Sequence, residues 1–339
     1  DQIDYEKITG NTIDFHNIVI PKKITITGFI IAIRIIRRII KKHQYEIVNS
    51  NNRNTSFLAR TALMTMPFSG VKNVYTARGM YFHDSQRLIP GVLTYWVEVF
   101  LLFFTDMVMS QSQEDVDRMS KNPLVNSSKL NVIHNGINTE RFSVESANPP
   151  NIKLSGFVVC TIGRIAKEKG LMDLLEAFSI FVRQESNSTL LLIGGVLHKE
   201  QDQVLVDFME LADKLNIKDK IYITGLVDNV EDYLSLADVY IHPSYREGVP
   251  RSVLEAMSLE KIVIATKIRG AKEIIKNGKN GILYTKGDIN ELGKMIEKVY
   301  SMTNDAKQII EKMARERVLY QYTEVSYVDR QVILINSLI

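Results

Sequence analysis

The segment from residue 238 to residue 255 reads Asp238-Val-Tyr-Ile-His-Pro-Ser-Tyr-Arg-Glu-Gly-Val-Pro-Arg-Ser-Val-Leu-Glu255. Its first five residues have the pattern of a buried strand, and a helix is expected to follow from about Arg251. Glu247 falls in the loop, next to a glycine that lets the backbone pass close to a ligand, and Glu255 falls in the helix. Open α/β sheets bind ligands at the carboxyl ends of their strands. We therefore expect both glutamates to face one ligand site, although a glutamate early in a helix is also common without function.

Around this segment, apolar runs of strand length alternate with longer runs of helical period, which is typical of a parallel sheet. In the second half of the chain, strands are expected at 157–162, 189–194, 221–224, 238–242, 262–265 and 281–284, and helices near 170–185, 201–215, 229–236, 251–259, 270–276 and 288–302. In the first half, strands are expected at 17–20, 45–49, 72–76, 106–110 and 130–134, and helices near 28–42, 54–66, 90–104 and 113–120.

The best candidate for a linker is Asn148-Pro-Pro-Asn151, because two prolines stop either type of element. The pattern predicts an α/β protein with two Rossmann-like, doubly wound domains. The first covers residues 1–147 and the second covers residues 148–322. A helix over 323–339 is expected to pack back on the first domain.

Another strand-to-helix corner, earlier in the chain, reads Gly163-Arg-Ile-Ala-Lys-Glu-Lys-Gly170. A helix that begins near Gly170 would offer free backbone N–H groups and the positive end of its dipole to an anion. Arg164 can meet phosphate oxygens with a planar fork, and Lys169 adds a mobile charge. Taken alone, these cations fit solvated loop charges equally well.

The composition is that of an ordinary globular protein, with 339 residues, 45% of them hydrophobic and 24% charged. The formal charge of +3 is too small to indicate nucleic acid as a partner. The single cysteine, Cys160, excludes an internal disulfide and is expected to be a buried thiol. The sequence shows neither a signal peptide nor an apolar run long enough for a bilayer, so we expect the cytoplasm as the compartment.

The order and separation of the two corners resemble the donor-binding half of glycosyltransferase family 4, the retaining enzymes of GT-B fold that use nucleotide-sugars. Further matches are 132–142 (with His134 where proline is usual), 223–228, 266–273 and 277–281. The resemblance implies two facing Rossmann-like domains with the donor bound in the cleft between them. Within this family, the sequence resembles in particular the bacterial enzymes of surface polysaccharide assembly. These enzymes transfer hexoses or N-acetylhexosamines from UDP to lipid-linked or glycan acceptors.

Residue roles follow from the resemblance position by position. Glu247 would contact the transferred sugar, Glu255 would hold the ribose hydroxyls, and Arg164 and Lys169 would stabilise the departing diphosphate. The remaining donor-binding residues would be Gly163, Gly194, Gly225, Leu226, Gly248, Val249, Arg251 and Ser252. No cofactor and no metal is implied, and the partners would be the nucleotide-sugar and its acceptor.

The acceptor half departs from the family pattern. Thr76-Ala-Arg-Gly-Met-Tyr-Phe-His83 places Arg78 where a histidine is usual, so that histidine's role is not carried over. On the acceptor side we expect Arg78, Gly79, His83 and Asn135. Nothing before residue 17 resembles the strand and Gly-rich loop with which the family opens, and we expect the natural protein to start upstream.

Three other signals stand outside the resemblance. Asp115 and Asp117 have the spacing of a metal-binding carboxylate pair, but Ser112 before them predicts a capping box on an exposed first helical turn. The helix at 28–42 carries basic residues at its C-terminal end, which suit either the helix dipole or an anionic membrane. The aromatic run at 95–104 predicts a core helix with an exposed fringe. Loose contact with the inner face of the plasma membrane is compatible with both helices.

Two rival functions stay open at this point. One is a UDP-sugar epimerase of similar fold, from which release of UDP only in the presence of an acceptor would distinguish a transferase. A truncated, non-catalytic binding partner would fit the absent first strand, whereas the intact donor-site residues argue against it.

Overall fold

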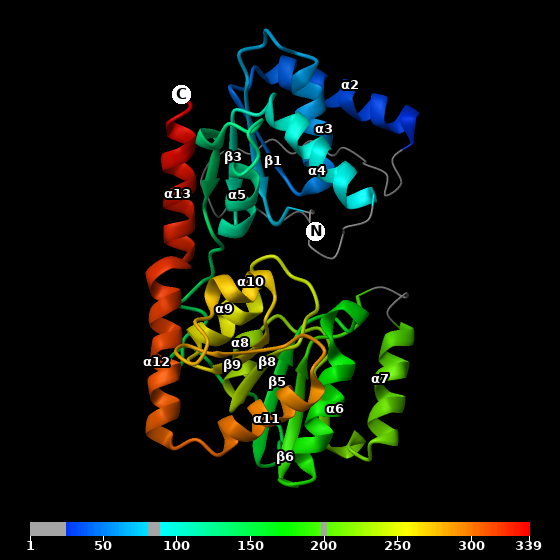
Figure 1. Cartoon of the computed structure of the whole chain (residues 1–339), viewed down its shortest axis with the longest axis vertical. Coiled ribbons are helices and arrows are strands. Elements are labelled where there is room, and N and C mark those ends of the chain that lie inside the picture. Colours follow the sequence, from blue (N-terminus) through cyan, green and yellow to red (C-terminus); the bar gives the residue numbers. More distant parts are fainter. Residues whose placement is uncertain (1–24, 81–88, 198–201) are drawn as a thin grey trace.

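The computed structural model describes residues 25–80, 89–197 and 202–339, and Figure 1 shows two α/β domains connected at one side by the red and orange C-terminal helices. The first domain has a four-stranded sheet of order β1-β2-β3-β4, and the second has a six-stranded sheet of order β10-β9-β8-β5-β6-β7. Every pairing between these strands is parallel. The prediction of two Rossmann-like domains is therefore confirmed, while the predicted strand at 17–20 lies outside the described residues.

In the N-terminal domain the elements alternate between strand and helix. They are α2 (Ile26–His43), β1 (Ile47–Asn51), α3 (Arg53–Met64), β2 (Lys72–Ala77), α4 (Ile89–Leu102), β3 (Met107–Ser110), α5 (Gln113–Ser120) and β4 (Leu130–Val132). Side-chain caps define the helix starts: the oxygens of Thr25, Asn52 and Ser112 accept from backbone N–H groups of α2, α3 and α5.

In the C-terminal domain the same alternation continues. Its strands are β5 (Phe157–Ile162), β6 (Ser188–Ile193), β7 (Ile221–Ile223), β8 (Val239–His242), β9 (Ile262–Thr266) and β10 (Ile282–Tyr284). Its helices are α6 (Leu171–Val182), α7 (Asp202–Lys214), α8 (Val230–Ser235), α9 (Arg251–Ser258), α10 (Arg269–Ile274) and α11 (Ile289–Tyr300).

The strand order of this second sheet sets the position of its ligand site. From β5 the chain proceeds outward through β6 and β7, and it then returns to pair β8 with the other side of β5. The loops that leave β5 and β8 therefore diverge to opposite faces of the sheet. The crevice between them is the switch point at which doubly wound sheets bind ligands.

Hydrophobic burial on both faces holds this sheet in place. One apolar cluster packs α6 and α11 on one face, and a second packs α9 and α10 on the other. Strand β5 supplies Val159 to the first cluster and Cys160 to the second, as a strand covered on both faces must. Burial raises the pKa of the Cys160 thiol, which agrees with a structural role.

Two segments cross between the domains, and they contact each other. The first crossing follows β4, and the second joins α12 (Asn304–Gln321) to α13 (Glu324–Asn336). The N–H of Ile137 donates to the carbonyl of Tyr322 at 2.9 Å, and the N–H of Glu324 donates back to Ile137 at 2.9 Å. Helix α13 then packs on the N-terminal sheet, where Tyr327 and Leu334 join an apolar cluster with strands β2 and β3.

A buried ion pair stabilises the N-terminal domain beneath β2. The Arg60 guanidinium is fully buried, donates to Glu98 at 2.8 Å and lies 4.2 Å from the centre of the Tyr75 ring. Its Nε and Nη1 atoms have no hydrogen-bond partner among the described residues. Glu98 is therefore the charge that makes burial of this arginine tolerable.

Removing one partner should cost far more stability than removing both. Glu98→Leu leaves a buried charge and is expected to lower the free energy of unfolding by about 3–5 kcal/mol. The double variant Arg60→Met with Glu98→Leu should recover most of that loss. Urea unfolding of the three proteins tests this, and a double variant as unstable as Glu98→Leu would contradict it.

Candidate active site

Two adjoining cavities lie between the domains, with volumes of 690 Å³ and 300 Å³. Both are lined by Arg78 from the N-terminal domain and by Arg164, Lys169 and Glu247 from the C-terminal domain. The larger cavity is also lined by the predicted residues Asn135, Gly163, Val249, Arg251, Ser252 and Glu255, and the smaller one by Gly79 and Gly248. The structure thus brings most of the residues singled out from the sequence to one cleft.

The first corner leaves β5 at Gly163, whose N–H donates to the carbonyl of Ile193 at 2.9 Å. The chain then makes a short 3-10 turn and begins α6 after Gly170, which has a φ of 64°. Arg164 is exposed and pairs with Glu168 at 3.4 Å across this turn. Such a surface pair contributes little stability, so the guanidinium is available to a ligand.

The second corner packs directly against the first. A Cβ atom at Gly170 would lie 2.2 Å from the carbonyl oxygen of Pro243, so no other residue fits there without a shift. The N–H of Tyr245 donates to the Glu168 carbonyl at 2.9 Å, and its hydroxyl donates to Asp173 at 2.7 Å. The relative position of the two corners is therefore fixed by backbone contact.

An ion pair joins the ligand-facing side chains of the two corners. Lys169 Nζ lies 2.5 Å from Glu247 Oε1, and both side chains are about one-fifth to one-quarter exposed, at 19% and 26%. The pair holds the ammonium group at the boundary of the two cavities. The sequence predicted both residues in the site but not their mutual contact.

Glu255 lies one helical turn into α9 and faces the larger cavity. Burial raises the pKa of its carboxyl group, and the nearby Arg251 and Arg141 oppose that shift. Arg251 Nε is 3.9 Å from Glu255 Oε1, at the far limit of an ion pair. The carboxylate is thus largely desolvated and holds acceptor capacity for ligand hydroxyl groups.

The N-terminal domain contacts the second corner at Gly248. A Cβ atom there would lie 3.0 Å from the carbonyl oxygen of Arg78. Close by, the buried Asn135 side chain donates to the Val249 carbonyl at 2.7 Å. These contacts place Arg78 and Gly79 opposite Glu247 across the cleft.

Other predicted donor residues lie beside the cleft. Gly194 packs against the first corner, since a Cβ atom on it would lie 2.0 Å from the carbonyl oxygen of Gly163. Gly194 also forms an isolated bridge with Gly225, and the neighbouring Leu226 side chain is 61% exposed. These three residues line neither of the two cavities. His83 lies outside the described residues.

Several cavity residues were not predicted. Glu324, Tyr327 and Val328 reach the larger cavity from α13, and Arg246 and Arg269 line the smaller one. No local pattern in the sequence marks α13 as part of the site, because its position depends on the second crossing. Arg269 could have been suspected, since it lies within the family-like segment 266–273.

The expectation that Asp115 lies on an exposed helical turn is wrong. Ser112 does cap α5, accepting from the N–H of Asp115 at 3.3 Å, but the Asp115 side chain is fully buried. It pairs with Arg269 of the other domain instead of turning back to the cap. Burial raises the pKa of the Asp115 carboxyl, and Arg269 opposes this shift. Asp117 is exposed and accepts from Gln113 at 2.7 Å.

Among the residues that the structure describes, no group of three or more His, Cys, Asp or Glu is arranged to hold a metal ion. Two histidines lie near the cleft, and both are held neutral. Burial lowers the pKa of His242 to about 3, with a smaller contribution from Lys169, and burial together with Arg330 and Arg317 lowers that of His134 to about 4.

Helices α2 and α4 both present apolar side chains to solvent. Helix α2 ends in Lys41, Lys42 and His43, as its basic pattern predicted. On α4 the aromatic run is a core helix with an exposed fringe, as predicted, because Val99 and Leu102 are buried while Trp96 and Phe100 are each at least half exposed. In the described parts of the chain, no helix combines the length and the apolarity that a bilayer span needs.

Two α/β domains with parallel sheets and a charged cleft between them define the class of the fold, which is GT-B. A solved glycosyltransferase from Rickettsia africae superposes with a TM-score of 0.77 at 21% identity, covering 96% of this chain and 84% of that one. The HepE protein of Anabaena, solved with UDP, gives a TM-score of 0.76 at 20% identity over 90% and 82% of the two chains.

The chain belongs to the family of glycosyl transferases group 1, whose model matches residues 144–316, and residues 3–141 match the model of Glycosyltransferase Family 4. Its relatives include the putative glycosyltransferase EpsD of Bacillus subtilis, 29% identical over 79% of this chain and 70% of that protein. The capsular polysaccharide biosynthesis glycosyltransferase CapM of Staphylococcus aureus is 27% identical over 88% and 79%. A third relative, from Escherichia coli, is named UDP-Gal:alpha-D-GlcNAc-diphosphoundecaprenol alpha-1,3-galactosyltransferase and is 25% identical over 86% and 76%. The chain is therefore a glycosyltransferase.

Gly170→Ala should disable transfer by separating the two corners. The new methyl group collides with Pro243, and we expect the rate of sugar transfer to fall roughly tenfold or more, because small displacements of positioning groups are costly. The matched control is Gly278→Ala, whose φ of 75° is equally strained but which has no atom within 4 Å. Activity assays and melting temperatures of both variants test this. Equal activity losses would show that backbone strain, and not the contact between corners, is responsible.

Proposed function

We propose that this chain is a retaining transferase that moves a hexose or N-acetylhexosamine from a UDP-sugar to a lipid-linked or glycan acceptor during assembly of a bacterial surface polysaccharide. The observation that carries the proposal is the convergence of Arg164, Lys169, Glu247 and Glu255 on one cavity at the switch point of the second sheet. Two cations suit a diphosphate, and two carboxylates suit sugar hydroxyl groups.

The choice of UDP as the donor nucleotide is supported by the similar proteins. The Escherichia coli relative is named for a UDP-galactose donor, and the Anabaena neighbour has been solved with UDP and with UDP-glucose. In this proposal, Glu255 accepts hydrogen bonds from ribose hydroxyls, and the missing side chain of Gly163 leaves room for the diphosphate beside Lys169. The identity of the sugar would be read by the groups around Glu247.

In this proposal, catalysis rests on stabilising charge on the departing nucleotide. As the sugar–phosphate bond breaks, negative charge grows on the diphosphate, and Arg164 and Lys169 are already in place to meet it. Lys169 is held there by Glu247, so one ion pair positions both the cation and the carboxylate. We propose that no metal ion is needed and that attack occurs on the face from which the nucleotide leaves, with the phosphate assisting deprotonation of the acceptor.

A lipid-linked acceptor is supported by the surplus of positive charge in the smaller cavity. Arg78 and Arg246 line it and form no ion pair within the described residues, unlike Arg164, Lys169 and Arg269. They provide charge for a second anion beside the donor diphosphate. The Escherichia coli relative is named for an acceptor that carries a diphospholipid.

We further propose that the N-terminal domain contacts an anionic bilayer through α2 and α4. Helix α2 lies at the end of the molecule remote from the C-terminal domain (Figure 1), and it combines basic residues with exposed isoleucines. The exposed Trp96 and Phe100 of α4 add aromatic area of the kind found at membrane interfaces. This contact would hold the cleft near a lipid-linked acceptor.

The proposed contact between Lys169 and the donor diphosphate is tested by Lys169→Ala. This variant should bind UDP more weakly and transfer sugar more slowly, on the order of a hundredfold. The matched control is Lys167→Ala, on the same turn but exposed and outside both cavities. Calorimetric titration with UDP and an assay of sugar transfer from UDP-sugars give the two readouts. Wild-type behaviour of Lys169→Ala would contradict the assignment.

The same assays separate the rival functions. Release of UDP that requires an acceptor supports a transferase, whereas sugar interconversion without an acceptor would indicate an epimerase. Absence of UDP binding would indicate a non-catalytic protein. The anomeric configuration of the product, read by NMR, tests retention. Metal-reversible loss of activity with chelator would contradict a metal-free mechanism.

The membrane contact predicts that the protein co-sediments with vesicles of phosphatidylcholine and phosphatidylglycerol but less with phosphatidylcholine alone. Substituting Trp96→Ser and Phe100→Ser together should abolish that binding, because the apolar face is then lost. The control is Val206→Ser on α7, where the side chain is 47% exposed in the other domain. Unchanged sedimentation of the double variant would refute the role of α4.

A further inference from the structure

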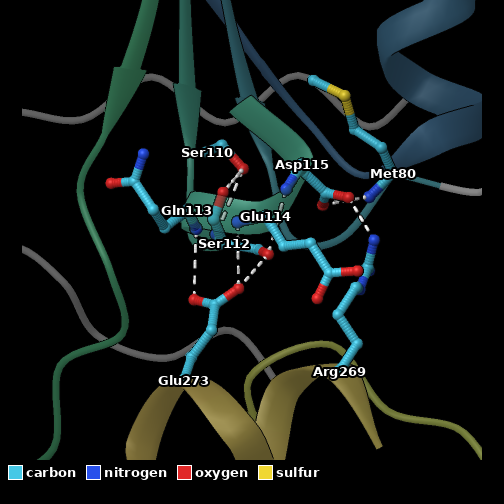
Figure 2. Close-up of polar contacts among 8 residues, drawn as sticks. All are labelled: Met80, Ser110, Ser112, Gln113, Glu114, Asp115, Arg269 and Glu273. Carbon is cyan, nitrogen blue, oxygen red and sulfur yellow. Dashed lines mark hydrogen bonds and ion pairs between the residues drawn. The ribbon is translucent and has the colours of Figure 1, made fainter. Parts of the chain in front are cut away.

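A dense polar junction joins the two domains beside the cleft, where the start of α5 meets α10 (Figure 2). At its centre is the fully buried side chain of Asp115, from the N-terminal domain. One carboxylate oxygen pairs with Arg269 of the C-terminal domain, and the other accepts from the N–H of Met80 at 2.8 Å. The sequence had marked this aspartate only as a capping or metal-binding candidate.

Glu273 of α10 makes the second contact of the junction. Its carboxylate accepts from the N–H groups of Gln113 at 3.1 Å and Glu114 at 3.2 Å, and from the hydroxyl of Ser112. These N–H groups belong to the first turn of α5, which has no partner for them within its own helix. A side chain of one domain thus completes the helix start of the other, as Figure 2 shows.

Both partners of the Asp115 carboxylate, Met80 and Arg269, connect it to the cleft. Met80 is two residues beyond Arg78, which lines both cavities and whose carbonyl faces Gly248. Arg269 itself lines the smaller cavity, together with Glu247. A single carboxylate therefore ties the Arg78 segment to the wall of the C-terminal domain that it faces.

We propose that Asp115 is a positioning residue for sugar transfer, which holds the Arg78 segment against the C-terminal domain and so keeps the cleft in its closed, reactive arrangement. The inference rests on the proposed function in that it assigns Arg78 to the acceptor side of the site. Asp115 touches neither cavity, so it acts through Met80 and Arg269 and not on the substrate.

The buried charges of Asp115 and Arg269 explain why this junction favours one arrangement of the two domains. Within the described residues, Arg269 is paired only with Asp115, and its Nε and Nη2 atoms are buried without a hydrogen-bond partner. Both charges are desolvated when the domains meet, and each is the only charged group that the other pairs with among the described residues. A buried pair of this kind contributes mainly by penalising other arrangements, in which one charge would stay buried and alone.

The test compares Asp115→Asn, Arg269→Gln and the double variant. Asparagine keeps the size of Asp115 and an acceptor for Met80, but it removes the charge that pairs with Arg269. We expect kcat for transfer to fall roughly a hundredfold, as for other displaced positioning groups, with the Kd for UDP within about twofold of wild type. The double variant should be no slower than the slower single variant, because both changes break the same contact.

Asp117→Asn is the matched control, since it makes the same chemical change two residues further along α5, at an exposed site. It should leave kcat unchanged. Melting temperatures show whether each variant is folded. Arg269→Lys keeps the positive charge and should therefore have a higher kcat than Arg269→Gln. Wild-type kcat in Asp115→Asn, or a loss of UDP affinity that parallels the loss of rate, would overturn the proposal.

A second readout does not depend on the substrate. Spin labels on Ser120→Cys and Lys279→Cys, both exposed and in different domains, report the distance between the domains, because the natural Cys160 is buried and unreactive. Asp115→Asn should broaden and lengthen this distance in the protein without ligand, and Asp117→Asn should not. An unchanged distance would refute the closing role even if the donor or acceptor proved to be different from those proposed.

Discussion

The ion pair between Lys169 and Glu247 joins two corners that leave neighbouring strands of one parallel sheet, and the cleft is built around it. The pair can form because β5 and β8 are adjacent although they are far apart in sequence. The backbones of the corners are already in contact at Gly170 and Pro243, so the side chains need little further ordering. Because backbone contact fixes the two corners relative to each other, less binding free energy is consumed in ordering them around a ligand.

The fold of the second domain could be predicted closely, because its strands are buried on both faces and read as continuous apolar runs. The expected strand at 157–162 coincides with β5, and the one at 189–194 is displaced by a single residue from β6. In the first domain β1, at the end of the strand order, is partly exposed, and the expected strand at 45–49 begins two residues before it. Helix α12 was not predicted, because only a narrow stripe of its surface is buried.

The candidate site could be predicted where function imposes a local pattern, as at both corners. It could not be predicted where a contact joins residues that are distant in the chain. The sequence around Asp115 predicts an exposed helical turn, because it does not reveal that Arg269 lies against this aspartate. Tyr327 was missed for the same reason, since only the path of α13 brings it to the cavity.

The path of α13 also has a consequence for biosynthesis. The helix completes the N-terminal domain and one wall of the larger cavity, yet it follows the entire C-terminal domain in the chain. During translation, an apolar face of the N-terminal sheet therefore stays without its α13 cover until the C-terminal domain has been synthesised. The active cleft is finished only as α13 emerges, so an mRNA truncated before this helix would yield a chain that lacks one wall of the larger cavity.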